Sequence, residues 1–178
     1  MRIRRYRQGD IPTLVHIQQA AAKVDSCEPL SEEDFEEWFS QPEFDPAFDV
    51  FLITDDDDEL NPWGQGGTLE GVEGEVIGYT VLQMRRSQHA YHFLCEGAVL
   101  PEQRGRGAGQ ALLICALNHA RVKAFEIEPQ AQEEGAPIYF EVLLPGHDPH
   151  AESLAAKCEL RSADEPTLKG MRLYRGDL

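Results

Sequence analysis

The chain has 178 residues, of which 42% are hydrophobic and 27% are charged, and its formal net charge is −16 at pH 7. This length and composition are ordinary for a folded protein with a core of its own, so we expect one domain over residues 1–178. The strong negative charge argues against general nucleic-acid binding, which needs a basic surface. The basic N-terminus precedes no apolar run, and no segment approaches the roughly 20 apolar residues of a membrane span.

Cysteine and histidine spacing gives no support to a disulfide framework or a metal site. None of the four cysteines forms a C-x-x-C pair, which favours free thiols in a reducing cytoplasm. His147 and His150 are three residues apart, but no cysteine or acidic cluster accompanies them at a zinc-like spacing. We therefore expect a cytoplasmic protein without a metal.

The first third of the chain predicts a strand, two helices and a second strand. Residues 2–6 predict the first strand, and Asp10 predicts the N-cap of the first helix. Ser31 with the acidic residues after it predicts the start of the second helix, whose aromatic side chains share one face. Residues 50–54 predict the next strand. The acidic, glycine-rich stretch 55–74 is aperiodic and predicts a mobile loop without calcium-loop spacing.

The second half alternates strands and helices. Gly97, inside one predicted strand, indicates a bulge or a close approach of two backbones. The segment 91–144 has the order of a strand–helix–strand unit, which implies a parallel pair with a right-handed crossover. The sequence therefore predicts an α/β fold, or α+β, with a mixed sheet. The elements predicted here are strands at 76–84, 91–99, 138–144 and 169–175, and helices at 110–125 and 148–157.

A turn rich in glycine and arginine joins the strand at 91–99 to the helix that follows it. The start of a helix has unpaired N–H groups and a positive partial charge, which together bind anions. Glycines let the backbone approach a phosphate, and arginines add charge. Neither the P-loop nor the dinucleotide pattern fits, because no Lys-Ser or Lys-Thr follows and Gln110 and Leu112 stand where a third glycine is needed. The alternative is a tight turn whose arginines only add surface charge.

The pattern R-x-x-G-x-G, formed by Arg104, Gly107 and Gly109, resembles the pyrophosphate loop of the GNAT superfamily of acyl-CoA N-acyltransferases. The strand sequence "EGAV" and Pro101 lie just ahead of it, as in that family. The element order is similar over almost the whole chain, and "HAESLAAKCEL" at 150–160 looks like the helix and turn that close the family's cofactor site. The resemblance implies a mostly antiparallel sheet with one parallel pair and helices on both faces.

The resemblance also implies acetyl-CoA as the cofactor and assigns its contacts. The backbone of 105–110 would hold the pyrophosphate, residues 97–99 would line the pantetheine arm, and the Val99 N–H would polarise the thioester carbonyl. The implied cofactor-binding residues are Gly97, Ala98, Val99, Arg104, Gly105, Arg106, Gly107, Ala108, Gly109 and Gln110.

The sequence identifies the catalytic groups less clearly than it identifies the cofactor contacts. Glu96 is the first candidate for the general base, because it directly precedes the implied cofactor contacts. If its side chain faces away from the substrate, Phe93 and Cys95 lie nearer the family's base positions, although neither is a good base; His89 and His92 are alternatives. The family's tyrosine acid corresponds to Ala155 and its asparagine to Asp148. Tyr139, Ser153 or water would then have to replace the acid.

The expected function is an N-acetyltransferase that transfers acetyl from acetyl-CoA directly to a primary amine. The acidic chain favours a cationic acceptor, either a small molecule or a peptide amine. Ala155 keeps open an alternative, a GNAT module that binds acyl-CoA with weakened turnover and has a regulatory or sensing role. The sequence is compatible with a monomer or a homodimer.

Overall fold

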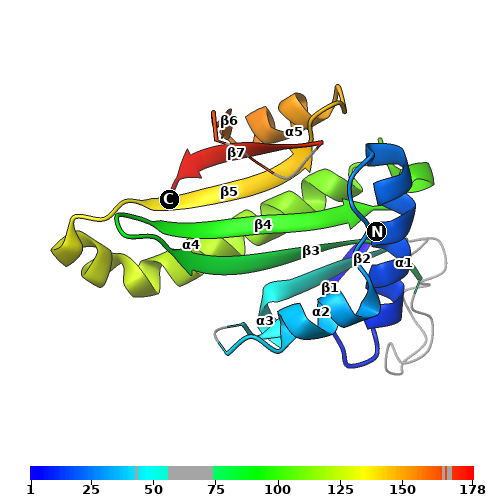
Figure 1. Ribbon diagram of the computed structural model, residues 1–178, viewed down its shortest axis with the longest axis horizontal. Helices are drawn as coiled ribbons and strands as arrows, with labels where there is room; N and C mark the ends of the chain where they lie inside the picture. The colour runs from blue at the N-terminus through cyan, green and yellow to red at the C-terminus, as the bar shows by residue number, and fades with distance from the viewer. Residues whose placement is uncertain (43, 56–73, 166, 168–169) are drawn as a thin grey trace, which may run out of the picture.

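One mixed sheet forms the frame of the protein. The computed structural model describes residues 1–42, 44–55, 74–165, 167 and 170–178, so all but the ends of the predicted loop 55–74 lies outside the described residues. Within the described residues the sheet has seven strands in the order β1-β2-β3-β4-β5-β7-β6, and β4 and β5 are its parallel pair (Figure 1). The strands are β1 Arg2–Arg5, β2 Val50–Asp55, β3 Glu75–Arg86, β4 Tyr91–Val99, β5 Ile138–Pro145, β6 Arg161–Ser162 and β7 Met171–Asp177.

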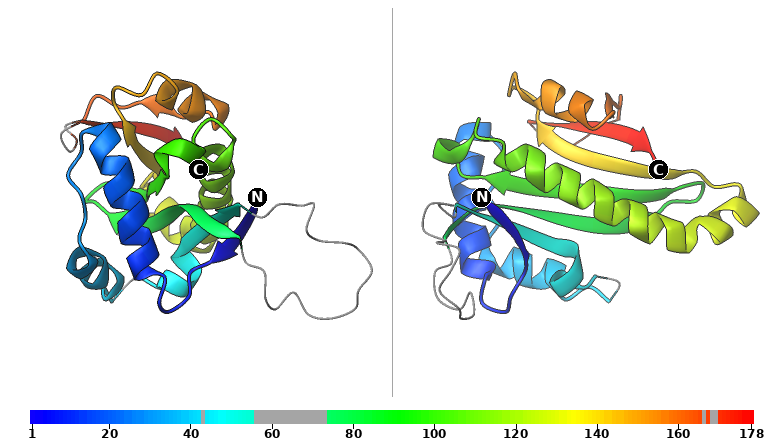
Figure 2. Two further views of the ribbon diagram at one scale, coloured as in Figure 1. Left: turned by 90° about the vertical axis from the view of Figure 1, so that its right-hand side faces the viewer. Right: turned by 180° about the vertical axis from the view of Figure 1, so that it is seen from behind.

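Helices cover both faces of this sheet, as predicted (Figure 2). α1 and α2 pack on one face through an aromatic and aliphatic cluster that includes Phe35 and Tyr79. α4 and α5 pack on the other face over Phe93 and Phe140. The mixed α/β architecture expected from the sequence is therefore confirmed. The helices are α1 Ile11–Asp25, α2 Glu32–Phe39, α3 Pro46–Asp49, α4 Ala108–Glu134 and α5 Ala151–Lys157, with a short 3₁₀ helix, η2, at Pro101–Gln103.

The two N-terminal helices begin where the sequence predicted, but only one is capped as expected. The Ser31 side chain accepts from the Asp34 N–H, and the Asp34 carboxylate accepts from the Ser31 N–H, which is a capping box. Asp10 occupies the N-cap of α1, yet its side chain makes no capping bond. Its carboxylate instead accepts from the Arg4 guanidinium at 2.8 Å and from the Arg7 N–H at 2.7 Å. Asp10 therefore stands at the predicted N-cap position, but its side chain does not cap the helix, because a charged partner takes the carboxylate.

α4 is longer than predicted and continues past Pro129 to Glu134. Its apolar face is buried and contains Leu113, Leu117, Ala120 and Ala124. The additional turns are held by tertiary contacts: Ala131 is buried, and the Glu134 carboxylate accepts from Arg86 and from the Tyr91 hydroxyl. These contacts outweigh the helix-breaking tendency of proline. Within the described residues, no helix is long and apolar enough to cross a membrane.

The C-terminal elements begin slightly later than predicted. Asp148 and His150 form a turn in which the Asp148 carboxylate accepts from the His150 N–H at 2.8 Å, so α5 starts at Ala151. β7 starts at Met171, and residues 168 and 169 lie outside the described residues. Two short elements, α3 and β6, were not predicted, because four and two residues carry too little periodicity.

Candidate active site

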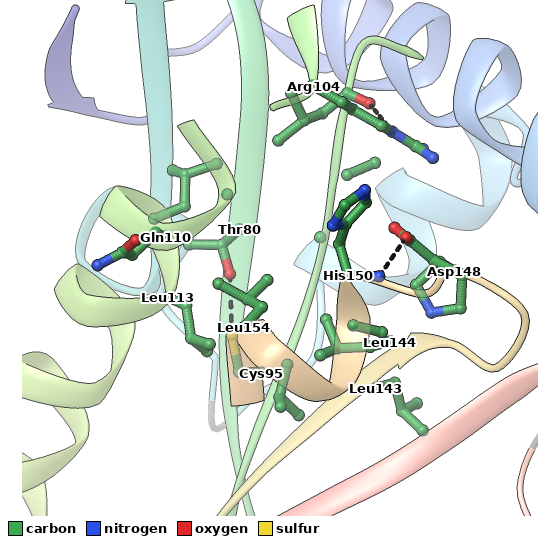
Figure 3. Close-up of a pocket in the computed structure, with 18 of the residues that line it drawn as sticks. Thr80, Cys95, Arg104, Gln110, Leu113, Leu143, Leu144, Asp148, His150 and Leu154 are labelled. Atoms are coloured by element: carbon green, nitrogen blue, oxygen red, sulfur yellow. Dashed lines mark hydrogen bonds between the residues drawn. The ribbon is translucent and has the colours of Figure 1, made fainter. Parts of the chain in front are cut away.

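A cavity of about 490 Å³ lies where β4 and β5 separate. The two strands pair from Tyr91 opposite Ile138 as far as Cys95 opposite Val142. Beyond that point β4 continues along β3, and β5 continues along β7, so the two strands diverge. The cavity is bordered by both diverging strand ends, by the first turn of α4 and by α5 (Figure 3).

β4 and β3 approach each other closely at Gly97. A Cβ atom placed on Gly97 would lie 2.3 Å from the Tyr79 carbonyl oxygen and 2.9 Å from the Thr80 Cα. Both contacts are far inside van der Waals distance and involve backbone atoms. The close approach predicted at Gly97 is confirmed; the predicted alternative, a bulge, is not seen there, because the β3–β4 register is regular.

Backbone N–H groups of β4 point into the cavity. Leu100 donates to the Ile77 carbonyl on the β3 side, whereas Tyr91 donates to the Pro137 carbonyl on the β5 side. Because hydrogen bonds alternate along a ladder, the odd-numbered residues of β4 direct their N–H groups toward β5. β5 no longer pairs with Gly97 or Val99, so these two N–H groups face the gap between the strands.

The turn between β4 and α4 depends on glycine. Gly105 has φ +78° and Gly107 has φ +93°, which are left-handed conformations that residues with a Cβ adopt only at a cost. Gly107 is the N-cap of α4, and no side chain caps the first backbone N–H groups of this helix. Gly105, Gly107, Gly109 and Gln110 all line the cavity. This arrangement is suited to an anionic group held by backbone atoms.

The two arginines of the turn are both paired with aspartates. Arg104 binds the Asp25 carboxylate through two hydrogen bonds of 2.7 and 2.8 Å, and its Nε donates to the Val99 carbonyl at 3.2 Å. Arg106 binds Asp55 at 3.0 Å and also contacts Gln103, at a more exposed position. Arg104 therefore connects the turn to the end of α1, and its guanidinium charge is balanced by a neighbouring carboxylate.

The end of α1 makes a second contact beside the cavity. His147, in the segment between β5 and α5, makes a 2.6 Å hydrogen bond to the Asp25 carbonyl. Asp25 and Arg104 both line the cavity. The end of α1 thus contacts both the segment that follows β4 and the segment that follows β5, the two strands that diverge.

Comparison with known families agrees with this geometry. A family profile described as "Acetyltransferase (GNAT) family" matches residues 24–139, which include the diverging part of β4 and the glycine turn. The chain belongs to the GNAT acetyltransferase family. No curated protein sequence matches the chain.

Solved structures share the GNAT fold at low sequence identity. The ribosomal-protein-alanine N-acetyltransferase from Brucella melitensis has a TM-score of 0.62 at 15% identity, with 100% of both chains covered. The GNAT superfamily phosphinothricin acetyltransferase from Sinorhizobium meliloti, in complex with AcCoA, has a TM-score of 0.58 at 18% identity over 99% of this chain and 88% of that one. A chain of the NatC complex bound to Gag peptide and CoA has a TM-score of 0.59 at 13% identity, covering 98% and 94%.

Glu96 lies beside the cavity of this GNAT protein, on the face covered by α1 and α2. Side chains alternate along a strand, so Ala98 shares the face of Glu96, and it packs against the hydrophobic cluster beneath α1 and α2. Phe93 and Cys95 are buried on the opposite face, which α4 covers. Burial raises the pKa of the Glu96 carboxyl, and the nearby Arg85 offsets part of this effect. Among the described residues the carboxylate has neither a hydrogen-bond nor an ion-pair partner. It is the candidate base with a side chain free to accept a proton.

The alternative bases are engaged elsewhere. His92 bonds to the Glu141 carboxylate at 3.0 Å through Nδ1 and to the Ser87 hydroxyl at 3.2 Å through Nε2. Burial raises the pKa of the Cys95 thiol to about 12, which keeps it protonated. His89 is exposed in the turn between β3 and β4.

The position expected to carry a catalytic acid is apolar. Ala155 is fully buried in the core between α5 and the sheet. Of the substitutes considered, Ser153 lines the cavity, whereas Tyr139 does not and packs against the His92 ring in a tilted arrangement. Asp148 lines the cavity as well.

Several lining residues were not found from the sequence, because they depend on tertiary structure. Asp25 reaches the site only through the packing of α1, and nothing in its local sequence signals this. The β5 residues 142–145 line the cavity because β5 diverges from β4, which no periodicity predicts. Leu154 and Lys157 come from α5, whose location was anticipated, although these two side chains were not.

Proposed function

We propose that this GNAT protein is an N-acetyltransferase that transfers acetyl from acetyl-CoA directly to a primary amine of a cationic acceptor. The observation that supports this best is the gap between β4 and β5, into which the Gly97 and Val99 N–H groups point beside an unpartnered Glu96. Family membership makes acetyl transfer the expected reaction, and the Sinorhizobium neighbour was solved in complex with AcCoA.

The residues present fit acetyl-CoA. A chain running between the diverging strands is adjacent to two unpaired N–H groups, and the turn at 105–110 offers backbone donors to its pyrophosphate. Bound acetyl-CoA supplies the thioester that is attacked. The Val99 N–H polarises its carbonyl, and one such donor contributes about 3 kcal/mol of transition-state stabilisation.

Glu96 accepts the proton that the amine gives up. Burial raises the pKa of this carboxyl, which makes its carboxylate a stronger base than that of an ordinary glutamate. Because its side chain lies on the α1–α2 face, the acceptor amine enters from that face. Water completes the proton transfer to the departing thiolate, since Ala155 has no hydroxyl.

The acceptor class follows from charge. A protein with a net charge of −16 attracts cations, and Glu96 adds a carboxylate at the site itself. Among the structural neighbours, one is named a ribosomal-protein-alanine N-acetyltransferase and another was solved with a peptide. A small polyamine or aminoglycoside and a peptide amine are the two classes to compare. We further infer a cytoplasmic monomer or homodimer, in keeping with four free cysteines.

The test measures CoA release from acetyl-CoA in the presence of polyamines, aminoglycosides and peptides. Acceptor-dependent release, with a mass increase of one acetyl group on the acceptor, is the expected result. Release that does not depend on any amine would contradict direct transfer. A neutral amine that outperforms every cationic one would contradict the acceptor class.

A second function, a binding module without turnover, is favoured by the fully buried Ala155. In that case acetyl-CoA binds in a calorimetric titration while no amine in the panel is acetylated. Loss of a general acid typically lowers a rate by about 10²–10⁴, so the assay must detect turnover slowed to that degree.

A further inference from the structure

The charged side chains around the cavity differ in whether they have a partner of opposite charge. Arg104 is paired with Asp25, and the Asp148 carboxylate accepts from a backbone N–H. The remaining lining cation with a permanent charge is Lys157, whose Nζ donates to the Gln110 side-chain oxygen at 3.1 Å. Within the described residues no carboxylate pairs with Lys157. An ammonium group with three donors and one neutral partner has capacity for a further acceptor.

Lys157 stands where the cofactor's phosphates are expected. It is the last residue of α5, and Gln110 is the third residue of α4. A Cβ on Gly109 would lie 3.8 Å from the Leu154 side chain, so the last turn of α5 lies against the first turn of α4. The ammonium therefore adds a full charge beside the positive end of a 27-residue helix.

We propose that Lys157 binds a phosphate group of coenzyme A and supplies the cofactor site with its principal side-chain cation. This inference rests on the proposed function, because it takes acetyl-CoA to be the ligand. The Gln110 oxygen is a neutral partner and is readily exchanged for a phosphate oxygen, whereas Arg104 would have to leave a bidentate carboxylate. Arg106 competes for the role, since its pairing with Asp55 is more exposed and therefore weaker.

The test is calorimetric titration with coenzyme A, 3′-dephospho-coenzyme A and pantetheine. Lys157→Gln is compared with Lys157→Arg, Arg106→Gln and Arg121→Gln. The last removes the same charge from an exposed position about 16 Å further along α4. Lys157→Gln is expected to weaken coenzyme A binding about 10–100-fold, the effect of one hydrogen bond to a charged group. Lys157→Arg restores most of the affinity, Arg106→Gln has a smaller effect, and Arg121→Gln has none.

The three ligands distinguish the phosphate from other sources of affinity. A loss that persists with the dephospho compound assigns Lys157 to the pyrophosphate, and a loss that disappears assigns it to the 3′-phosphate. Coenzyme A affinity unchanged in Lys157→Gln, a larger loss in Arg106→Gln, or an equal loss for pantetheine overturns the inference. If the unaltered protein fails to bind coenzyme A, the proposed function fails first, and that titration shows it independently of any variant.

Discussion

The β4–α4 unit and the β5–α5 unit border the same cavity but meet their backbone requirements differently. In the first, Gly97 accommodates a backbone contact, and Gly105 and Gly107 take the left-handed conformations of the turn. In the second, the left-handed position after α5 is occupied by Glu159, at φ +62°, and Ala155 stands where an acid was expected. The difference shows that the first unit meets its backbone requirements with glycine, whereas the second meets one of them with a residue that carries a side chain.

Gly97→Ala tests the β4–α4 unit at its most restrictive point, and we expect the largest effect there. The new methyl group would meet the Tyr79 carbonyl at 2.3 Å, and relief requires β3 and β4 to move apart. Overpacking of this kind costs about 2 kcal/mol or more of unfolding free energy. Urea denaturation measures the loss, and titration with acetyl-CoA measures the expected loss of binding.

Gly109→Ala is the matched control for stability. Its Cβ would have ordinary contacts at 3.8 and 3.9 Å, inside a helix where alanine is favoured. Its unfolding free energy should equal or exceed that of the unaltered protein. Equal stability of the Gly97 and Gly109 variants would show that the close approach at Gly97 is unimportant.

Glu96→Gln tests whether the proposed acetyl transfer depends on a carboxylate side chain beside the cavity. We expect kcat to fall about 10²–10⁴-fold, because the amide cannot accept the amine proton. Acetyl-CoA affinity should change little, since Glu96 does not line the cavity. Steady-state kinetics and titration on the same preparation separate the two effects.

The pH dependence of the activity is a second test of the role of Glu96. Because burial raises the pKa of Glu96, its carboxylate is lost on acidification at a higher pH than an ordinary glutamate would be. Activity should fall as the pH drops through that raised pKa, and the advantage over Glu96→Gln should shrink with it. A constant ratio of the two activities across the acid range would remove Glu96 from the role of base.

Asp25→Asn weakens the contact that joins the two units. The substitution removes the charge that holds Arg104 and leaves the shape of the side chain. We expect a loss of about 1–3 kcal/mol in unfolding free energy, the cost of an imperfect partner for a partly buried charge, and weaker acetyl-CoA binding. Asp49→Asn is the control: this buried carboxylate holds His119 and Lys123 away from the cavity. It should lower stability and leave cofactor affinity unchanged.

The β4–α4 unit could be predicted because its determinants are local. The glycine turn, the strand before it and the apolar face of α4 are periodic or positional signals, and the structure shows the turn and the buried helix face where they were expected. The assignment of individual residues to acetyl-CoA stays a prediction. The extension of α4 past Pro129 was missed because Arg86 and Tyr91, far away in sequence, hold Glu134.

The contacts across the cavity could not be predicted from the sequence. Arg104 was expected to contact phosphate, whereas its bidentate pairing with Asp25 joins two residues that are 79 positions apart in the sequence. The phosphate-binding role now proposed for Lys157 also depends on tertiary structure, because it was inferred from the pairing of Arg104 and Arg106 with aspartates. Local patterns locate a site, whereas the distribution of charge within it is a property of the tertiary structure.

Glu159→Gly should have the smallest effect, and its sign is what makes it informative. The Leu160 N–H donates to the Ala155 carbonyl and the Glu159 N–H to the Ala156 carbonyl, which is the Schellman motif with Glu159 at the left-handed position. Glycine relieves roughly 1–2 kcal/mol of backbone strain there and loses part of it to greater freedom in the unfolded chain. We expect a gain of about 0.5–1 kcal/mol by urea denaturation.

Gly135 offers the opposite experiment on the other unit. It follows α4 at φ +64°, with nothing within 4 Å of a Cβ added to it. Gly135→Ala should therefore destabilise the protein through backbone strain alone, by about 1 kcal/mol. A gain at 159 together with a loss at 135 shows that the same backbone requirement operates in both units and that only one satisfies it with glycine. If both substitutions destabilise, Glu159 has a stabilising contact that offsets its strain, and the closing unit is more specialised than its sequence indicates.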